Sequence, residues 1–223
     1  MANDQLTDLV RRLVLLELSS ARPDQVIPVG LTAKHVHISQ EDFYRLFGPG
    51  ATLNVFHQLS QSGEFSATET VDLVGPKRAL YGVRILGPFR SETQVEVSRS
   101  DGYVLGLNPP VRQSGDLVGT PGIHLIGLRG AIKLEKGVIT PGRHIHMNPE
   151  EARRLGVKDK QVVAVGFPGK RAGVLDEVMV HVKPGYNLEM HVDLDEGNAL
   201  GLKTGDSGFL LKNFDHRSYS PFR

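Results

Sequence analysis

From residue 26 onward, the chain consists mainly of short runs of strand-forming residues separated by Gly and Pro. Examples are the runs 82–86, 94–97 and 161–165, which are rich in valine and isoleucine. Many short strands with turn signals between them are typical of barrels and sandwiches, whereas a parallel βαβ sheet places a helix between successive strands. The pattern predicts a mainly β fold.

Two short helices are expected to interrupt the strands. One follows Ser39 and stops at Gly48, and the other follows Asn148 and stops at Gly156. Each begins after a residue that can cap a helix, carries an acid at its third position and ends at a glycine. This order of residues is typical of a real helix with both ends specified.

The two predicted helices lie in an internal repeat. The segments 34–39 and 143–148 share the order basic residue, His, β-branched residue, His, apolar residue and helix cap. A second match lies downstream in each half, between 94–107 and 189–202. Repeated sequence predicts repeated structure. We therefore expect two related β-barrel domains, capped by short α-helices, that meet near residues 130–140.

The first twenty residues predict an amphipathic α-helix. Leu6, Leu9 and Leu13 follow the helical spacing, and Arg12 lies on the other side. A helix this short is marginal alone, so we expect it to dock on its own domain, a sister subunit or another protein. The expected division of the chain is a helix at 1–20, a linker at 21–25, barrel units at 26–135 and 136–213, and a tail at 214–223.

Each half of the repeat carries a pair of histidines two residues apart. Residues two apart in a strand point the same way, so His35 and His37 share a face, as do His144 and His146. Neutral imidazole is a good zinc ligand. One such pair could equally be an ordinary hydrogen-bonded pair, but two pairs before matching helices indicate metal binding. The chain has no cysteine, so any further ligand must be His, Asp or Glu.

The repeat nominates a third ligand in each half. Aligning the downstream matches places Glu96 opposite His191, and both residue types bind zinc. Six ligands make two sites of three, each with a position open for water or substrate, which is typical of catalytic zinc. The other histidines have no partner at ligand spacing; they are His57, His124, His181 and His216.

Arg90 stands just upstream of Glu96, where the second half has Gly185. A guanidinium group near a metal carboxylate can bind phosphate through two parallel hydrogen bonds. The plainer interpretation is a solvated arginine. Only one half of the repeat carries this arginine, so the two metal sites are expected to differ in function.

Several classes of partner are disfavoured by composition. The formal net charge is only +1, which gives no long-range attraction to a nucleic-acid backbone. No run is long and apolar enough to span a bilayer. The lack of cysteine excludes disulfides and a cysteine nucleophile, and no serine nucleophile elbow is present. We expect neither nucleic acid nor a membrane as a partner.

Five motifs together resemble one enzyme family, the phosphotransacylases of bacterial microcompartments of the phosphate propanoyltransferase type. The motifs lie at 30–39, 87–97, 108–117, 143–152 and 190–199, so the resemblance covers nearly the whole chain.

The resemblance implies a fold, an activity and a location. It implies two β-barrel domains capped by short helices, and two metal ions, usually zinc, on the six candidate ligands, with Arg90 in the active site. It implies reversible transfer of a propanoyl or acetyl group between coenzyme A and phosphate. It also implies that the N-terminal helix directs the enzyme into the microcompartment lumen, by contact with shell or lumen proteins, in propanediol degradation. We further expect a homo-oligomer.

Two other functions and two ligand arrangements remain open from sequence. The functions are a dinuclear metallohydrolase and a non-catalytic barrel protein with a structural metal. Each unit could build its own metal site, or the sites could be crossed, with His191 joining His35 and His37 while Glu96 joins the other pair. We favour the crossed arrangement, since a substrate spanning both metals needs them close together.

Overall fold

The structure is a computed structural model that describes residues 25–211. The described chain divides into two compact units. The barrel unit comprises 25–31, 143–192 and 196–211, and the sheet unit comprises 32–142 with 193–195. The predicted N-terminal helix and C-terminal tail lie outside the described residues. No helix in the described part has both the length and the apolar character needed to cross a membrane.

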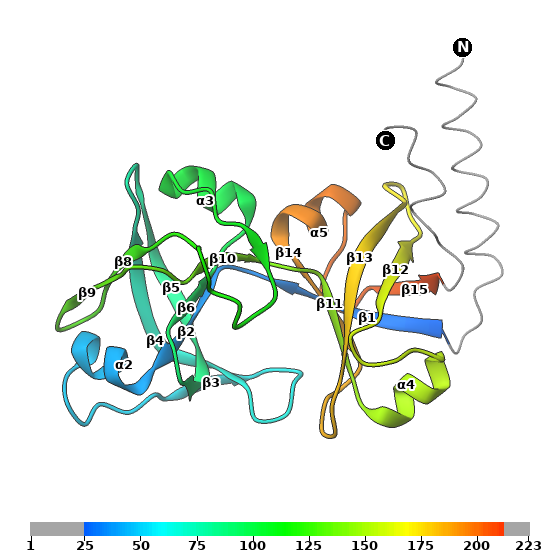
Figure 1. The fold of residues 1–223 in the computed structure, drawn as a ribbon, viewed down its shortest axis with the longest axis horizontal. Coiled ribbons are helices and arrows are strands. Elements are labelled where there is room, and N and C mark those ends of the chain that lie inside the picture. Colours follow the sequence, from blue (N-terminus) through cyan, green and yellow to red (C-terminus); the bar gives the residue numbers. More distant parts are fainter. Residues whose placement is uncertain (1–24, 212–223) are drawn as a thin grey trace, which may run out of the picture. The chain divides into compact units, whose positions relative to one another are not determined.

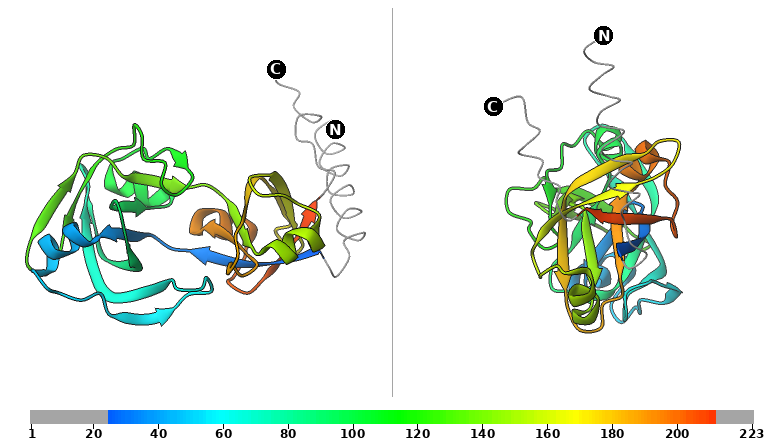
Figure 2. Two further views of the ribbon diagram at one scale, coloured as in Figure 1. Left: turned by 60° about the horizontal axis from the view of Figure 1, so that its bottom comes forward. Right: turned by 90° about the vertical axis from the view of Figure 1, so that its right-hand side faces the viewer.

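The barrel unit is a closed barrel of six strands, hydrogen-bonded in the order β1-β14-β11-β13-β12-β15 (Figure 1). The strands are β1 (Val26–Thr32), β11 (His144–Met147), β12 (Val162–Phe167), β13 (Gly173–Val182), β14 (Glu189–Asp193) and β15 (Ser207–Leu211). Its helices, α4 (Pro149–Leu155) and α5 (Leu194–Leu200), lie at opposite ends of the barrel (Figures 1 and 2). Side chains that point inward form one apolar core, which includes Phe167, Ile145 and Met190.

The sheet unit is a nine-stranded sheet ordered β7-β10-β6-β2-β5-β4-β8-β9, with β3 paired to β4. The strands are β2 (His35–Ser39), β3 (Val55–Gln58), β4 (Phe65–Val74), β5 (Ala79–Arg90), β6 (Gln94–Glu96), β7 (Val111–Arg112), β8 (Ile123–Ile126), β9 (Ala131–Leu134) and β10 (Val138–Pro141). Its helices are α2 (Gln40–Phe47) and α3 (Arg99–Leu105). A separate apolar core, which includes Phe43 and Ile85, holds this unit together.

The two predicted helices form where their caps indicated. The Ser39 hydroxyl accepts a hydrogen bond from the Asp42 backbone N–H at the start of α2. At α4, the side chains of Asn148 and Glu151 form a capping box with each other's backbone N–H groups. Gly156 ends α4 in the left-handed region at φ +67°, where a side chain would be strained.

The mainly β class is confirmed, but three details differ from the sequence-based expectation. The sheet unit is a half-barrel, because its nine-stranded sheet does not close as the six-stranded barrel does. Strand β1 was expected in the first unit, yet it pairs with β15 of the barrel unit. Strand β10, expected in the second unit, pairs with β6 and β7 of the sheet unit. Strand partners that are far apart in sequence cannot be identified from a local pattern. The two units in the structure therefore do not divide at the predicted boundaries near residues 26 and 136.

The internal repeat corresponds to a repeated arrangement of strands. In the sheet unit, β2 lies between antiparallel β6 and parallel β5. In the barrel unit, β11 lies between antiparallel β14 and parallel β13 in the same way. Each unit therefore has a central strand that carries a histidine pair, and an antiparallel neighbour that carries the third candidate ligand.

Candidate functional site

The sheet unit gathers His35, His37 and Glu96 into one buried group. His35 and His37 point to the same face of β2, and the antiparallel register places Glu96 of β6 directly opposite His35. His35 Nε2 lies 3.2 Å from His37 Nε2. The Glu96 carboxylate oxygens lie 3.4 Å from His35 Nε2 and 3.6 Å from His37 Nε2. Each of the three residues is at most 6% exposed.

These distances fit a metal site. Ligand atoms at the corners of a tetrahedron are roughly 3.3 Å apart when their bonds to zinc are about 2.0 Å long. The three separations in the structure lie close to that value. The His35 Nδ1–H donates to the Ala33 carbonyl oxygen at 2.9 Å, so the lone pair of His35 lies on Nε2, toward the group. A ring orientation fixed in this way is typical of histidines that bind metals.

His37 is held in the neutral form that metal binding requires. Burial lowers the pKa of His37 well below its ordinary value of 6.5, and the charges of His35 and Arg90 lower it further. The lone pair of His37 therefore stays available near neutral pH. The effect of Arg90 also indicates that its positive charge lies close to the group.

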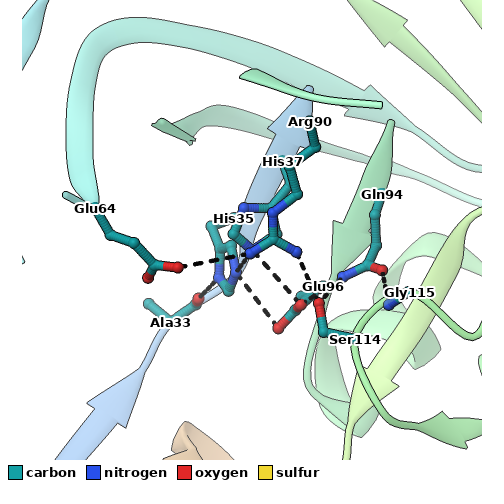
Figure 3. A network of polar contacts seen from close by, with 9 residues as sticks. All are labelled: Ala33, His35, His37, Glu64, Arg90, Gln94, Glu96, Ser114 and Gly115. Atoms are coloured by element: carbon teal, nitrogen blue, oxygen red, sulfur yellow. Dashed lines mark hydrogen bonds and ion pairs between the residues drawn. The ribbon is translucent and has the colours of Figure 1, made fainter. Parts of the chain in front are cut away.

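Arg90 is joined to this group by a chain of hydrogen bonds (Figure 3). Its guanidinium Nη1 donates to the Ser114 hydroxyl at 2.8 Å. The Gln94 amide donates to the same hydroxyl at 2.9 Å and to a Glu96 oxygen at 2.6 Å. Glu64 lies 3.9 Å from the other guanidinium nitrogen. Arg90 is therefore held beside the candidate metal ligands, and its side chain is 35% exposed.

The turn that follows β7 takes part in the site. In the structure, the Gly115 N–H donates to the Gln94 amide oxygen at 2.7 Å, and Ser114 contacts Arg90. The turn therefore fixes Gln94 from both sides and orients the guanidinium group.

The barrel unit gathers His144, His146 and His191 into a second group. The register of β11 and β14 places His191 directly opposite His144, and the ligand atoms of the three side chains lie within 4.8 Å of one another. All three side chains are partly exposed. Three imidazoles form a donor set that suits zinc with an open coordination position.

Two acidic or basic residues beside this second group were missed from sequence. The Glu189 carboxylate accepts a hydrogen bond from His191 Nε2 at 2.6 Å. His181 of β13 lies opposite His146, with the two ring centres 5.9 Å apart. Burial lowers the pKa of His181, which the charge of Asp159 partly opposes. The position of Glu189 could have been found, because it aligns with Gln94 in the repeat.

The grouping of ligands corrects one expectation. The crossed arrangement joined His191 to His35 and His37, and joined Glu96 to the other histidine pair. In the structure each unit assembles its own three residues, so the crossed arrangement is wrong. The reason is that the third ligand reaches the histidine pair through the neighbouring antiparallel strand of the same sheet.

Comparison with known proteins identifies the family. Residues 28–203 match the family model of phosphate propanoyltransferase. The chain is 48% identical over 208 residues to a phosphate propanoyltransferase of Thermotoga maritima. The aligned region covers 93% of this chain and 99% of that protein. It is 40% identical over 215 residues to that of Listeria monocytogenes, covering 95% and 98%. For Rhodopseudomonas palustris the identity is 48% over 180 residues, covering 81% and 80%. On this evidence the chain belongs to the phosphate propanoyltransferase family of acyltransferases.

Proposed function

We propose that the enzyme moves a propanoyl or acetyl group reversibly between coenzyme A and inorganic phosphate, and that it depends on zinc or another divalent metal. The observation that carries this proposal is the link from Arg90 through Ser114 and Gln94 to the group of His35, His37 and Glu96. An anion-binding guanidinium and a set of metal ligands therefore lie in one site of the sheet unit.

Two groups of residues would hold the metals. His35, His37 and Glu96 would hold one ion, and His144, His146 and His191 would hold the other. When bound, zinc would polarise the thioester carbonyl and stabilise negative charge on oxygen and sulfur. The group in the sheet unit is the better candidate for the chemical step, because Arg90 lies beside it and the described residues of the barrel group include no matching arginine.

Arg90 would bind and orient phosphate. A guanidinium group offers two parallel N–H donors that match two oxygens of a phosphate. The hydrogen bond to Ser114 holds the group in place, and the ion pair with Glu64 is long enough, at 3.9 Å, to be replaced by an incoming dianion. Exposure of about one third of the Arg90 side chain leaves room for a ligand.

The reaction would proceed by direct attack. A phosphate oxygen bonds to the carbonyl carbon of the thioester, the carbon–sulfur bond breaks, and coenzyme A leaves with the proton that phosphate gives up. The products are acyl phosphate and free coenzyme A. No acyl-enzyme is required, which agrees with a chain that has no cysteine. Preorganised positive charge at the developing oxyanion contributes most to reactions of this kind.

An assay with acyl-coenzyme A substrates of increasing length tests the proposal. Thiol release must require phosphate and must be matched by acyl phosphate. Equal thiol release without phosphate would mean hydrolysis instead, as expected of a metallohydrolase. The preference between propanoyl and acetyl groups follows from the ratio of kcat/KM values.

We also propose that the enzyme works as a homo-oligomer inside a microcompartment that degrades propanediol. The support is the predicted amphipathic helix at 1–20, which lies outside the described residues. Deleting residues 1–20 should leave transferase activity in solution and abolish co-purification with shell proteins. Retained co-purification would contradict this role, and light scattering of the purified protein measures the oligomeric state.

A further inference from the structure

Glu189 lies at the edge of the histidine group in the barrel unit. It precedes His191 by two residues on β14, so both side chains point to the same face. The strand register places Glu189 opposite His146. Its Oε2 atom lies 2.6 Å from His191 Nε2, and its side chain is only 16% exposed. A carboxylate therefore stands in contact with one of the three candidate ligands.

The fold leaves space for this carboxylate at Gly30. A Cβ atom at Gly30 of β1 would lie 2.9 Å from the Glu189 carboxyl carbon and 3.1 Å from each of its oxygens. Real Cβ atoms essentially never make contacts under 3.0 Å, and contacts of 3.1 Å are uncommon. An alanine at this position would require the end of the Glu189 side chain to shift. The backbone of β1 thus forms a close-fitting wall behind Glu189.

The sheet unit has a counterpart at the matching position. Gln94 precedes Glu96 by two residues and donates a hydrogen bond to it at 2.6 Å, as His191 donates to Glu189. The chemical roles are exchanged between the units. In the sheet unit the third ligand is the carboxylate and its partner is a neutral amide. In the barrel unit the third ligand is an imidazole and its partner is the carboxylate.

This exchange gives each site one negative charge. Two imidazoles and a carboxylate surround the site of the sheet unit, while three imidazoles and the nearby Glu189 surround the site of the barrel unit. Three neutral imidazoles alone would leave both charges of a divalent ion uncompensated. A carboxylate within a few ångströms offsets one of them, and this attraction is strong where the side chains are mostly shielded from water.

We propose that Glu189 is a positioning residue of the metal site in the barrel unit, which fixes the His191 ring and supplies a nearby negative charge. The inference deepens the proposed function and rests on its metal site. The hydrogen bond to Glu189 occupies His191 Nε2 and leaves Nδ1 of that ring as the nitrogen that can bind an ion. A carboxylate that holds the outer nitrogen of a metal-binding histidine fixes the orientation of the ring and strengthens metal binding.

A cobalt titration tests this in a protein that retains only the barrel site. The double substitution His35→Ala and His37→Ala removes the site of the sheet unit. Cobalt(II) binding is followed by its visible absorption, which reports affinity, coordination number and ligand type without any measurement of catalysis. Adding Glu189→Gln should weaken cobalt binding by about 10- to 100-fold, the range seen when a carboxylate close to a metal site is lost, and should change the spectrum.

Two further variants separate the carboxylate from general damage to the fold. Glu150→Gln makes the same change at an exposed position of α4 in the same unit and should leave cobalt binding unchanged. Gly30→Ala keeps every ligand atom but shifts the Glu189 carboxylate, and it should weaken binding less than Glu189→Gln does. Thermal unfolding of each metal-free variant shows whether the barrel still folds.

Two negative outcomes of the cobalt titration have different meanings. Unchanged affinity and spectrum in Glu189→Gln would overturn the role of Glu189 and leave the metal site intact. Absence of cobalt binding in the folded His35→Ala, His37→Ala protein would overturn the metal site of the barrel unit and this inference with it.

Discussion

At the scale of single residues, the site of the sheet unit combines a neutral histidine pair with a positive guanidinium group. Burial and the nearby charges of His35 and Arg90 keep His37 unprotonated. The Arg90 guanidinium group donates to the Ser114 hydroxyl, which fixes its direction. The candidate metal ligands and the guanidinium group therefore belong to one network of polar contacts.

The role of Arg90 can be tested by truncation. Arg90→Ala should lower kcat/KM for phosphate by roughly 100- to 1000-fold, the usual cost of losing one preorganised charge-stabilising group. Arg90→Lys should recover only part, since lysine lacks the planar pair of donors. Arg153→Ala, at an exposed position of α4, is the matched control and should keep the wild-type rate. Near-normal phosphate-dependent rates in Arg90→Ala would contradict the assignment.

The lowered pKa of His37 predicts how stability depends on pH. Unfolded His37 titrates near 6.5, whereas folded His37 resists protonation. The unfolded chain therefore takes up more protons as the pH falls through 6.5, and the free energy of unfolding of the metal-free protein should decrease below that pH. Above pH 6.5, the full contribution of neutral His37 to the free energy of unfolding is present.

Urea unfolding of metal-free protein at pH values from about 5 to about 8 measures this slope. His37→Gln cannot titrate and should show a shallower decline than the wild type. Identical slopes in the two proteins would mean that groups other than His37 cause the pH dependence.

At the scale of elements, local sequence signals predicted what depends on neighbouring residues. The caps of α2 and α4 and the shared face of each histidine pair were read correctly because cap chemistry and strand alternation span only a few residues. Helix α3 was missed although Ser98 caps it through the Asp101 N–H and Gly106 ends it. The exchange of β1 and β10 between units was not predictable, because it depends on partners far away in the chain.

For the candidate ligands, too, only the features that depend on nearby residues could be predicted from sequence. The six residues could be named from the repeat, since each half carries the same order of residues. Their division into two groups was predicted wrongly, because it depends on which strand lies beside β2 and β11. Gln94, Ser114 and Glu189 were missed as neighbours of the ligands, since a serine in a turn or an amide in a strand is ordinary until its contacts are known.

The capping box of α4 predicts a measurable contribution to stability. Asn148→Ala removes the side chain that accepts hydrogen bonds from the Glu150 and Glu151 N–H groups. The free energy of unfolding should fall by about 1 kcal/mol. Asn148→Ser keeps an acceptor and should lose less. Denaturant unfolding measures both, and equal stability in Asn148→Ala and wild type would show that the cap contributes nothing.

The turn after β7 should be important for phosphate binding. Ser114→Ala removes the hydroxyl that contacts Arg90 and Gln94. A hydrogen bond to a charged group contributes about 1.5–3 kcal/mol, so KM for phosphate should rise by roughly 10-fold or more. KM for acyl-coenzyme A should change less. Steady-state kinetics with each substrate varied in turn distinguishes this from a general loss of activity.

At the scale of the whole molecule, each unit has its own apolar core and its own group of three candidate ligands. The two halves of the sequence repeat form a closed barrel and a half-barrel sheet. They also differ in chemistry, because only the sheet unit pairs its ligand group with an arginine at the position of Arg90. The unit with Arg90 is expected to perform the chemical step.

Removing the metal tests whether the activity of the enzyme depends on bound metal ions. Exhaustive chelation should abolish formation of acyl phosphate, and added zinc should restore it. Elemental analysis of the restored protein should find two ions per chain, one for each group of ligands. Full activity in protein with no measurable metal would contradict the proposed mechanism.

The order of the strands along the chain determines which unit can fold first during synthesis. Strand β1 pairs with β15, so the first and last described strands of the barrel are neighbours. The sheet unit, apart from 193–195, lies between them in sequence. A nascent chain that has reached Gly142 already contains every strand of the sheet unit, whereas β1 still has none of its partners. Domains generally fold as units during translation. We therefore expect the ligand group of the sheet unit to assemble first, and the barrel to close only after β15 has been synthesised.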